Sequence, residues 1–141
     1  MIPVTIIDPT DPYSEKVAGD QSFLKCLIRH APDDFQFTWI GISAGTIRYE
    51  RGRANTVSYG KHKLTFVPLL REDNENRRRR IPLSLRFVFR LMGCRVPRRG
   101  LLLFNRVEPV LLFAKEKARN VLFVHNNMNS MLEQHIVASA W

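Results

Sequence analysis

The stretch Ile2–Ile28, IPVTIIDPTDPYSEKVAGDQSFLKCLI, decides the fold class. It opens with Ile2–Ile7, which is rich in β-branched and apolar residues and predicts a short buried strand. Asp8–Pro12 follows as a dense turn signal, and Asp20 is a candidate N-cap for a helix. The apolar residues after it have the spacing of one helix face: Phe23, Leu24, Leu27 and Ile28. The order strand, loop, helix predicts the start of an α/β domain.

The rest of the chain repeats this alternation. Strands are predicted at Phe35–Ile42, Thr46–Arg51, Lys63–Leu70, Leu101–Phe104 and Asn120–Val124, and helices at Ile81–Met92, Val110–Lys117 and Met128–Ala140. Gly52–Gly60 is expected as a polar connection. Ile81–Met92 also alternates like a strand, but Pro82 suits a first helical turn and favours the helix. Strands that alternate with helices predict a Rossmann-like, mostly parallel sheet with helices on both faces.

Length and composition are those of one globular domain. The chain has 141 residues, of which 45% are hydrophobic and 25% charged. A bilayer span needs about 20 apolar residues, and no such run and no signal peptide are visible. Cys26 and Cys94 have apolar neighbours and no CxxC or metal-ligand spacing, so we expect two buried thiols in a reducing, cytoplasmic protein. We expect no metal ion or cofactor.

Positive charge is concentrated in one part of the chain. Arg71–Arg99 contains ten arginines and three acidic residues, which is +7 of the formal net charge of +9. Three interpretations are open: a solvated loop and helix face, an anionic membrane surface bound peripherally, or nucleic acid. No zinc spacing, RNP-like motif or helix-turn-helix pattern favours nucleic acid. The residues proposed for a membrane or anionic surface are Arg77, Arg78, Arg79, Arg80, Arg86 and Arg90.

Ligands of open α/β sheets bind beyond the carboxyl ends of the strands. In this chain that rule selects Asp8–Gly19, Asn105–Glu108 and His125–Asn127. These three segments therefore hold the candidate functional residues.

Three stretches resemble family 4 glycosyltransferases, which have two facing Rossmann-like domains in the GT-B architecture. GDQSFLKCLIRHAPDDF is similar to the first helix of that family, LLLFNRVEPVLLF to its strand and helix with Glu-Pro at the start, and NVLFVHNN to the strand that ends in a histidine facing the cleft. The resemblance implies that residues 1–141 are the N-terminal, acceptor-side domain, ending before a donor-binding domain and inactive alone. It also implies a nucleotide-sugar donor, an acceptor hydroxyl as the second substrate, and retention of stereochemistry.

The resemblance gives His125 the role of binding the transferred sugar or the acceptor and orienting the reaction. An imidazole can donate or accept a hydrogen bond near neutral pH. A histidine at a strand end can also simply satisfy loop backbone groups. Gly19 and Asp20 correspond to the phosphate loop of the family, where backbone N–H groups at a helix N-terminus can bind phosphate. The alternatives are a turn at Gly19 and an N-cap at Asp20.

Glu108, Asn126 and Asn127 are candidates for contacts to sugar or acceptor hydroxyls. Glu108 could also act as a base, or merely stabilise a helix through its dipole, and the asparagines could be helix caps. The alternative function for the whole chain is a non-catalytic basic α/β module that binds anionic lipid or nucleic acid.

Overall fold

The computed structural model describes residues 1–14, 19–44, 47, 49–71, 80–97, 99–115 and 119–123. The strands are β1 (Ile2–Ile7), β2 (Phe35–Ser43), β3 (Asn55–Tyr59), β4 (His62–Arg71), β5 (Leu101–Phe104) and β6 (Arg119–Leu122). The helices are α1 (Gly19–His30), α2 (Leu83–Met92) and α3 (Val107–Phe113).

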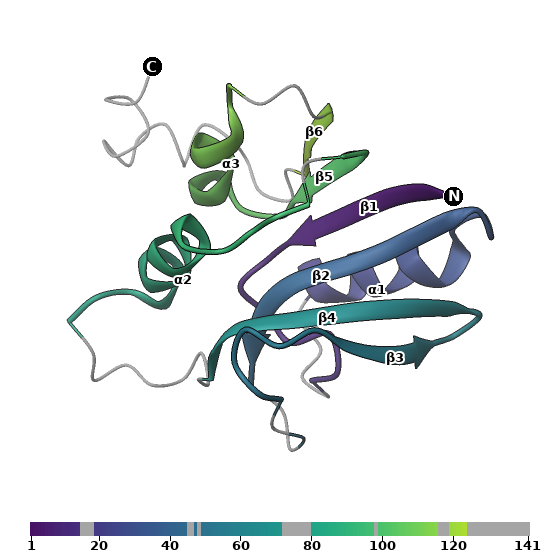
Figure 1. The fold of residues 1–141 in the computed structure, drawn as a ribbon, viewed down its shortest axis with the longest axis horizontal. Coiled ribbons are helices and arrows are strands. Elements are labelled where there is room, and N and C mark those ends of the chain that lie inside the picture. Colours follow the sequence, from purple (N-terminus) through teal and green to yellow (C-terminus); the bar gives the residue numbers. More distant parts are fainter. Residues whose placement is uncertain are drawn as a thin grey trace.

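The strands form one mixed, mostly parallel sheet in the order β3-β4-β2-β1-β5-β6 (Figure 1). β1 lies in the middle and pairs in parallel with β2 on one side and β5 on the other. β3 is the antiparallel edge strand and pairs with β4. With β3 set aside, the parallel strands have the order of a Rossmann-like sheet, in which the chain winds outward in both directions from the first strand.

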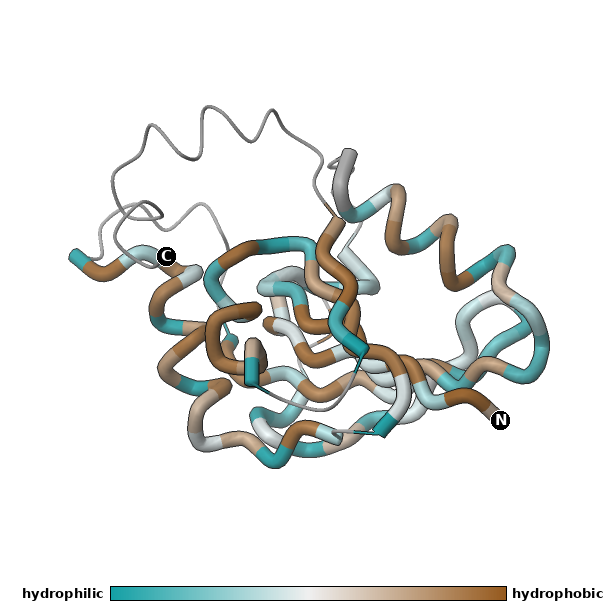
Figure 2. The backbone as a smooth tube through the Cα atoms, turned by 90° about the horizontal axis from the view of Figure 1, so that it is seen from above, coloured by the Kyte–Doolittle hydropathy of each residue, from teal (hydrophilic) through white to brown (hydrophobic). Residues whose placement is uncertain are grey.

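The sheet is covered on both faces, as the sequence predicts. Val4, Ile6 and Trp39 pack with the buried side of α1, whereas Ile7 and Ile40 pack with α2 and α3. Successive residues of a strand point to opposite faces, so the near-continuous apolar runs of β1 and β2 supply both cores. Along the backbone, hydrophobic stretches recur between short hydrophilic ones (Figure 2). The fold is therefore a three-layer α/β/α arrangement.

Two predictions for the segment between β2 and β4 are wrong. Residues 47 and 49–51 lie outside any strand, and the strand β3 falls instead within Gly52–Gly60, which was expected to be a polar connection. Thr56 and Tyr59 suit an edge strand, and Gly60, at φ 61°, makes the tight turn into β4. Pairing with β4 in the hairpin therefore makes this polar stretch a strand.

Helix limits and cysteine burial also differ from expectation. α1 begins at Gly19, so Asp20 lies in its first turn rather than at the N-cap position, and α3 spans Val107–Phe113 rather than 110–117.

Cys26 is exposed and Cys94 half-buried, so the prediction of two buried thiols is wrong. Two residues turn a helix by more than half a circle, so Cys26 lies outside the buried side of α1 that Leu24 and Ile28 form. Partial burial raises the pKa of the Cys94 thiol.

Gly41 in β2 lets the backbone of the loop after β1 approach the backbone of β2 very closely. A Cβ at Gly41 would collide with the backbone oxygen of Thr10 and would lie 3.0 Å from that of Asp8. The amide of Ile42 donates to the same Thr10 oxygen at 3.2 Å, which fixes the loop in place. The absence of a side chain at Gly41 is therefore needed for the path of the loop.

We predict that Gly41→Ala lowers the free energy of unfolding by about 3 kcal/mol, because the backbone of the loop must move. The measurement is urea denaturation followed by circular dichroism. Gly52→Ala is the matched control: no atom lies within 4 Å of its Cβ position, and its positive φ costs about 1 kcal/mol. An equal loss in the two variants would contradict the close approach at Gly41.

Candidate functional site

The winding of the sheet reverses between β1 and β5. The chain leaves β1 through α1 towards β2, and leaves β5 through α3 towards β6 on the opposite side. The last paired residues of the two strands are Ile7 and Phe104. Asp8 and Asn105 follow directly. They are therefore neighbours at the edge of the sheet where the parallel strands end, here called the carboxyl edge. In sheets of this kind the reversal is where ligands bind, which makes this edge the candidate site.

The loop after β1 is polar in sequence but buried in the structure. Asp8, Thr10 and Asp11 all have less than a tenth of their surface exposed. The Thr10 hydroxyl donates to the Asp8 carboxylate. Asp11 accepts from the backbone amides of Tyr13 at 2.9 Å and of Ala44, just after β2, at 2.8 Å. Because both of its oxygens hold backbone groups, Asp11 ties the loop to β2 and positions Asp8.

The outer end of this loop is anchored by Lys25 and Tyr13. The Lys25 ammonium donates to the Ser14 carbonyl at 2.8 Å, and burial lowers the pKa of Lys25 despite the opposing charge of Asp11. The ring of Tyr13 packs edge-on against Phe66 of β4, with ring centroids 6.0 Å apart. Burial, reinforced by Tyr49 and other neighbours, raises the pKa of the Tyr13 phenol. Its hydroxyl oxygen is buried and has no hydrogen-bond partner among the described residues.

Asn105 is the clearest candidate for ligand contact at this edge. It is 9% exposed, and neither its amide nitrogen nor its amide oxygen has a hydrogen-bond partner within the described part of the chain. Buried amides are nearly always hydrogen-bonded, and an unsatisfied one needs an explanation. A ligand hydroxyl beside Asn105 could accept from the amide nitrogen and donate to the amide oxygen.

The predicted site residues fall at this edge only in part. Gly19 begins α1, and Glu108 lies half-buried in the first turn of α3, three residues after Asn105. His125, Asn126 and Asn127 lie outside the described residues. Asp8 and Asn105 were within the segments selected by the strand-end rule but were not singled out. Their position directly after buried strands was the available signal, whereas the missing partners of Asn105 could only be seen in the structure.

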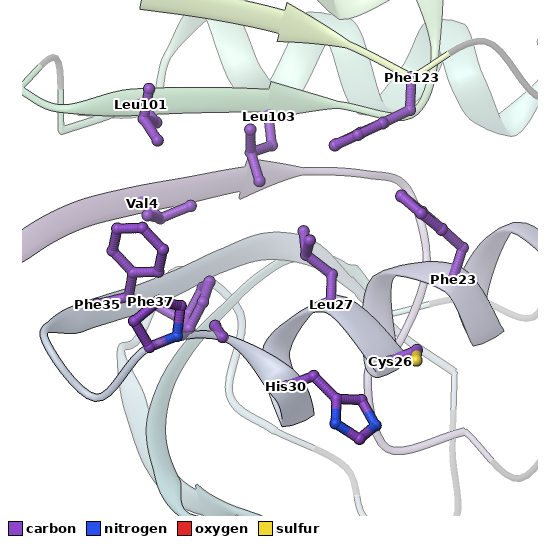
Figure 3. A pocket seen from close by; sticks show the side chains of 12 residues that line it. Val4, Phe23, Cys26, Leu27, His30, Phe35, Phe37, Leu101, Leu103 and Phe123 are labelled. Carbon is purple, nitrogen blue, oxygen red and sulfur yellow. The ribbon is translucent and has the colours of Figure 1, made fainter.

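An apolar pocket of about 490 Å³ lies elsewhere, between α1 and one face of the sheet (Figure 3). Phe23 of α1 and Phe123 after β6 face one another across it, with ring centroids 4.8 Å apart. Val4, Phe35 and Leu101 line its floor, and these residues belong to the amino-terminal halves of their strands. The pocket thus reaches from the amino-terminal ends of these strands to Phe123, directly after β6, and offers few polar groups for catalysis or orientation.

No group of three or more metal-ligating side chains occurs in the described ranges. Comparison with protein-family models, curated proteins and solved structures found no match. The functional argument therefore depends on the carboxyl edge itself.

We predict that Asn105→Leu raises the free energy of unfolding by about 1 kcal/mol. Leucine has a similar shape, and it removes a buried amide that costs about 1–3 kcal/mol when unsatisfied. Chemical denaturation of the wild-type chain and the variant measures the difference. A marked loss of stability would mean that the amide has structural partners and is not reserved for a ligand.

We also predict that stability falls above about pH 10, the ordinary pKa of tyrosine. The pKa of Tyr13 is raised in the folded state, so its contribution is complete below the unfolded pKa and is lost as the pH rises above it. Tyr13→Phe should weaken this alkaline decline and add about 1 kcal/mol at neutral pH by removing the unpartnered hydroxyl. Denaturation between pH 7 and 11 tests both effects, and curves that coincide over the whole range would contradict both.

Proposed function

We propose that this chain is the acceptor-side domain of a sugar transferase that moves a glycosyl group from a nucleotide-sugar to a hydroxyl group. The observation that carries the proposal is the buried Asn105 amide, without partners among the described residues, at the β1–β5 reversal. A sugar presents hydroxyls that can each donate and accept, which matches both atoms of that amide. The sequence resemblance to family 4 glycosyltransferases supports the same class.

The surroundings of Asn105 suit a polyhydroxylated ligand. Asp8 lies beside it at the strand end with its carboxylate held by Thr10, and Glu108 follows on α3. Carboxylates accept strong hydrogen bonds from hydroxyl groups. Together these groups offer acceptors at two points and one amide that can both donate and accept, which is the pattern expected for orienting a sugar.

In the proposed reaction the bond from the anomeric carbon to the diphosphate oxygen breaks and a bond to the acceptor oxygen forms. The acceptor hydroxyl gives its proton to the diphosphate oxygen, which leaves with the electron pair of the broken bond. In this chain Asn105 and Asp8 would bind and orient the acceptor or the sugar. His125 and Glu108 are the proposed groups for contact to the reacting hydroxyl, and Gly19 for contact to phosphate. The donor-binding domain implied by the resemblance would hold the nucleotide, and no metal or other cofactor is invoked.

The test measures nucleoside diphosphate release by the intact gene product from UDP- and GDP-hexoses, with free hexoses and a lipid extract as acceptors. We expect acceptor-dependent release by the wild type. Asn105→Leu should lower it about tenfold or more, because one or two ligand hydrogen bonds are lost. His125→Ala should abolish it without changing the fold seen by circular dichroism.

Gln36→Leu is the matched control. It also replaces an amide by an aliphatic side chain, but Gln36 is exposed at the amino-terminal end of β2, away from the carboxyl edge. We expect wild-type release from this variant. No acceptor-dependent release with any donor, or full activity of Asn105→Leu, would overturn the proposal.

A further inference from the structure

Helix α2 is amphipathic, and the side of it that faces away from the sheet is also apolar in part. Phe87 and Leu91 point inward and are fully or almost fully buried. Leu85, Phe89 and Met92 recur on the other side at intervals of three or four residues and are exposed, and Ile81, just before the helix, is exposed as well. Phe89 and Met92 are 63% and 66% exposed. Residues at this spacing share one side of a helix, so they form a continuous apolar stripe, here called the α2 stripe.

The neighbouring helix also exposes apolar side chains. α3 packs against α2 on the same face of the sheet. Its Leu111 and Leu112 are exposed. Single exposed apolar residues are common, but a contiguous group of them marks an interaction surface.

The chain segment that contains α2 carries charge of one sign. From Arg77 to Val107 the sequence contains ten arginines and no aspartate or glutamate. Arg80, Arg90, Arg95, Arg99 and Arg106 are exposed, Arg86 is half-buried, and Arg77, Arg78, Arg79 and Arg98 lie outside the described residues. Arg90 lies in the last turn of α2, next in sequence to Phe89. Exposed apolar and cationic side chains therefore occur together on one short helix and its flanks.

This combination matches the chemistry of an anionic bilayer surface. Helices that lie in the plane of a bilayer insert apolar side chains at the level of the headgroups while arginines contact lipid phosphates. Nucleic-acid backbones would use the arginines but would leave the aliphatic residues of the α2 stripe in water. No described helix has the length and apolar character to cross a membrane.

We propose that the α2 stripe and its flanking arginines bind the surface of an anionic lipid bilayer, with Phe89 and Met92 inserted among the headgroups. This inference does not rest on the proposed sugar transfer, since it uses a different part of the fold. The two therefore fail separately: vesicle binding is measured without any nucleotide-sugar, and transfer to a free hexose is measured without vesicles.

The experiment is co-sedimentation of the full chain with vesicles of phosphatidylcholine alone and with phosphatidylcholine containing about one third phosphatidylglycerol. We expect binding to the anionic vesicles that weakens as salt is raised. Phe89→Ser with Met92→Ser should lower the partition coefficient about tenfold, since two inserted side chains are lost. Arg90→Glu should lower it by a similar factor.

Arg29→Glu is the matched control, because Arg29 is also an exposed arginine in the last turn of a helix but belongs to α1 on the other face of the sheet. It makes the same change in net charge and should leave binding close to that of the wild type. Circular dichroism of every variant confirms that the fold is kept, and Phe89→Ser alone replaces the double variant if that one unfolds.

Equal weak binding to both vesicle types, or no binding, would overturn the inference. So would equal losses from Arg29→Glu and Arg90→Glu, which would show general charge attraction rather than a surface on α2. If binding to a single-stranded oligonucleotide depends on Arg90 while vesicle binding is unaffected by the Phe89 and Met92 changes, the surface is one for nucleic acid and the inference is wrong.

Discussion

The structure depends on the parallel pairing of β1 with both β2 and β5. β1 is the central strand, and its side chains enter both cores: Val4 and Ile6 on the α1 face and Ile7 on the face covered by α2 and α3. A strand buried on both faces must be apolar throughout, and its register with each neighbour is fixed by what it buries. The two halves of the sheet are joined through this strand, so its position decides where every other strand end lies.

The same pairing creates the candidate site. Because β2 and β5 flank β1 and the chain winds away from it in both directions, Asp8 and Asn105 meet at the carboxyl edge although they are far apart in sequence. Gly41 and the backbone contacts of Asp11 then hold the loop after β1 tightly over the end of β2. Rigid support of this kind suits a site that orients its ligand, because it holds the loop backbone in one position.

The sequence alone predicts the strands and helices whose apolar residues are buried. It does not predict features that depend on contacts with distant segments. The apolar runs of β1, β2 and β5 predict these strands directly, and Pro82 correctly favours a helix for α2. β3 was missed because its polar residues become a strand only through pairing with β4. At the site, the strand-end rule selected Glu108, which lies half-buried in the first turn of α3. It could not reveal that the amide of Asn105 has no partner among the described residues, because that depends on the packing of distant segments.

The most direct test of the account is an NMR titration of the backbone amides of the chain with UDP-glucose, GDP-mannose and free hexoses. The account predicts that the largest shifts occur at Thr10, Asn105 and their immediate neighbours, and that Asn105→Leu removes them. It also predicts little change at the apolar pocket, for which Phe35 and Leu101 report. Shifts confined to that pocket, or no shifts at millimolar ligand, would contradict the claim that the β1–β5 edge is the functional site.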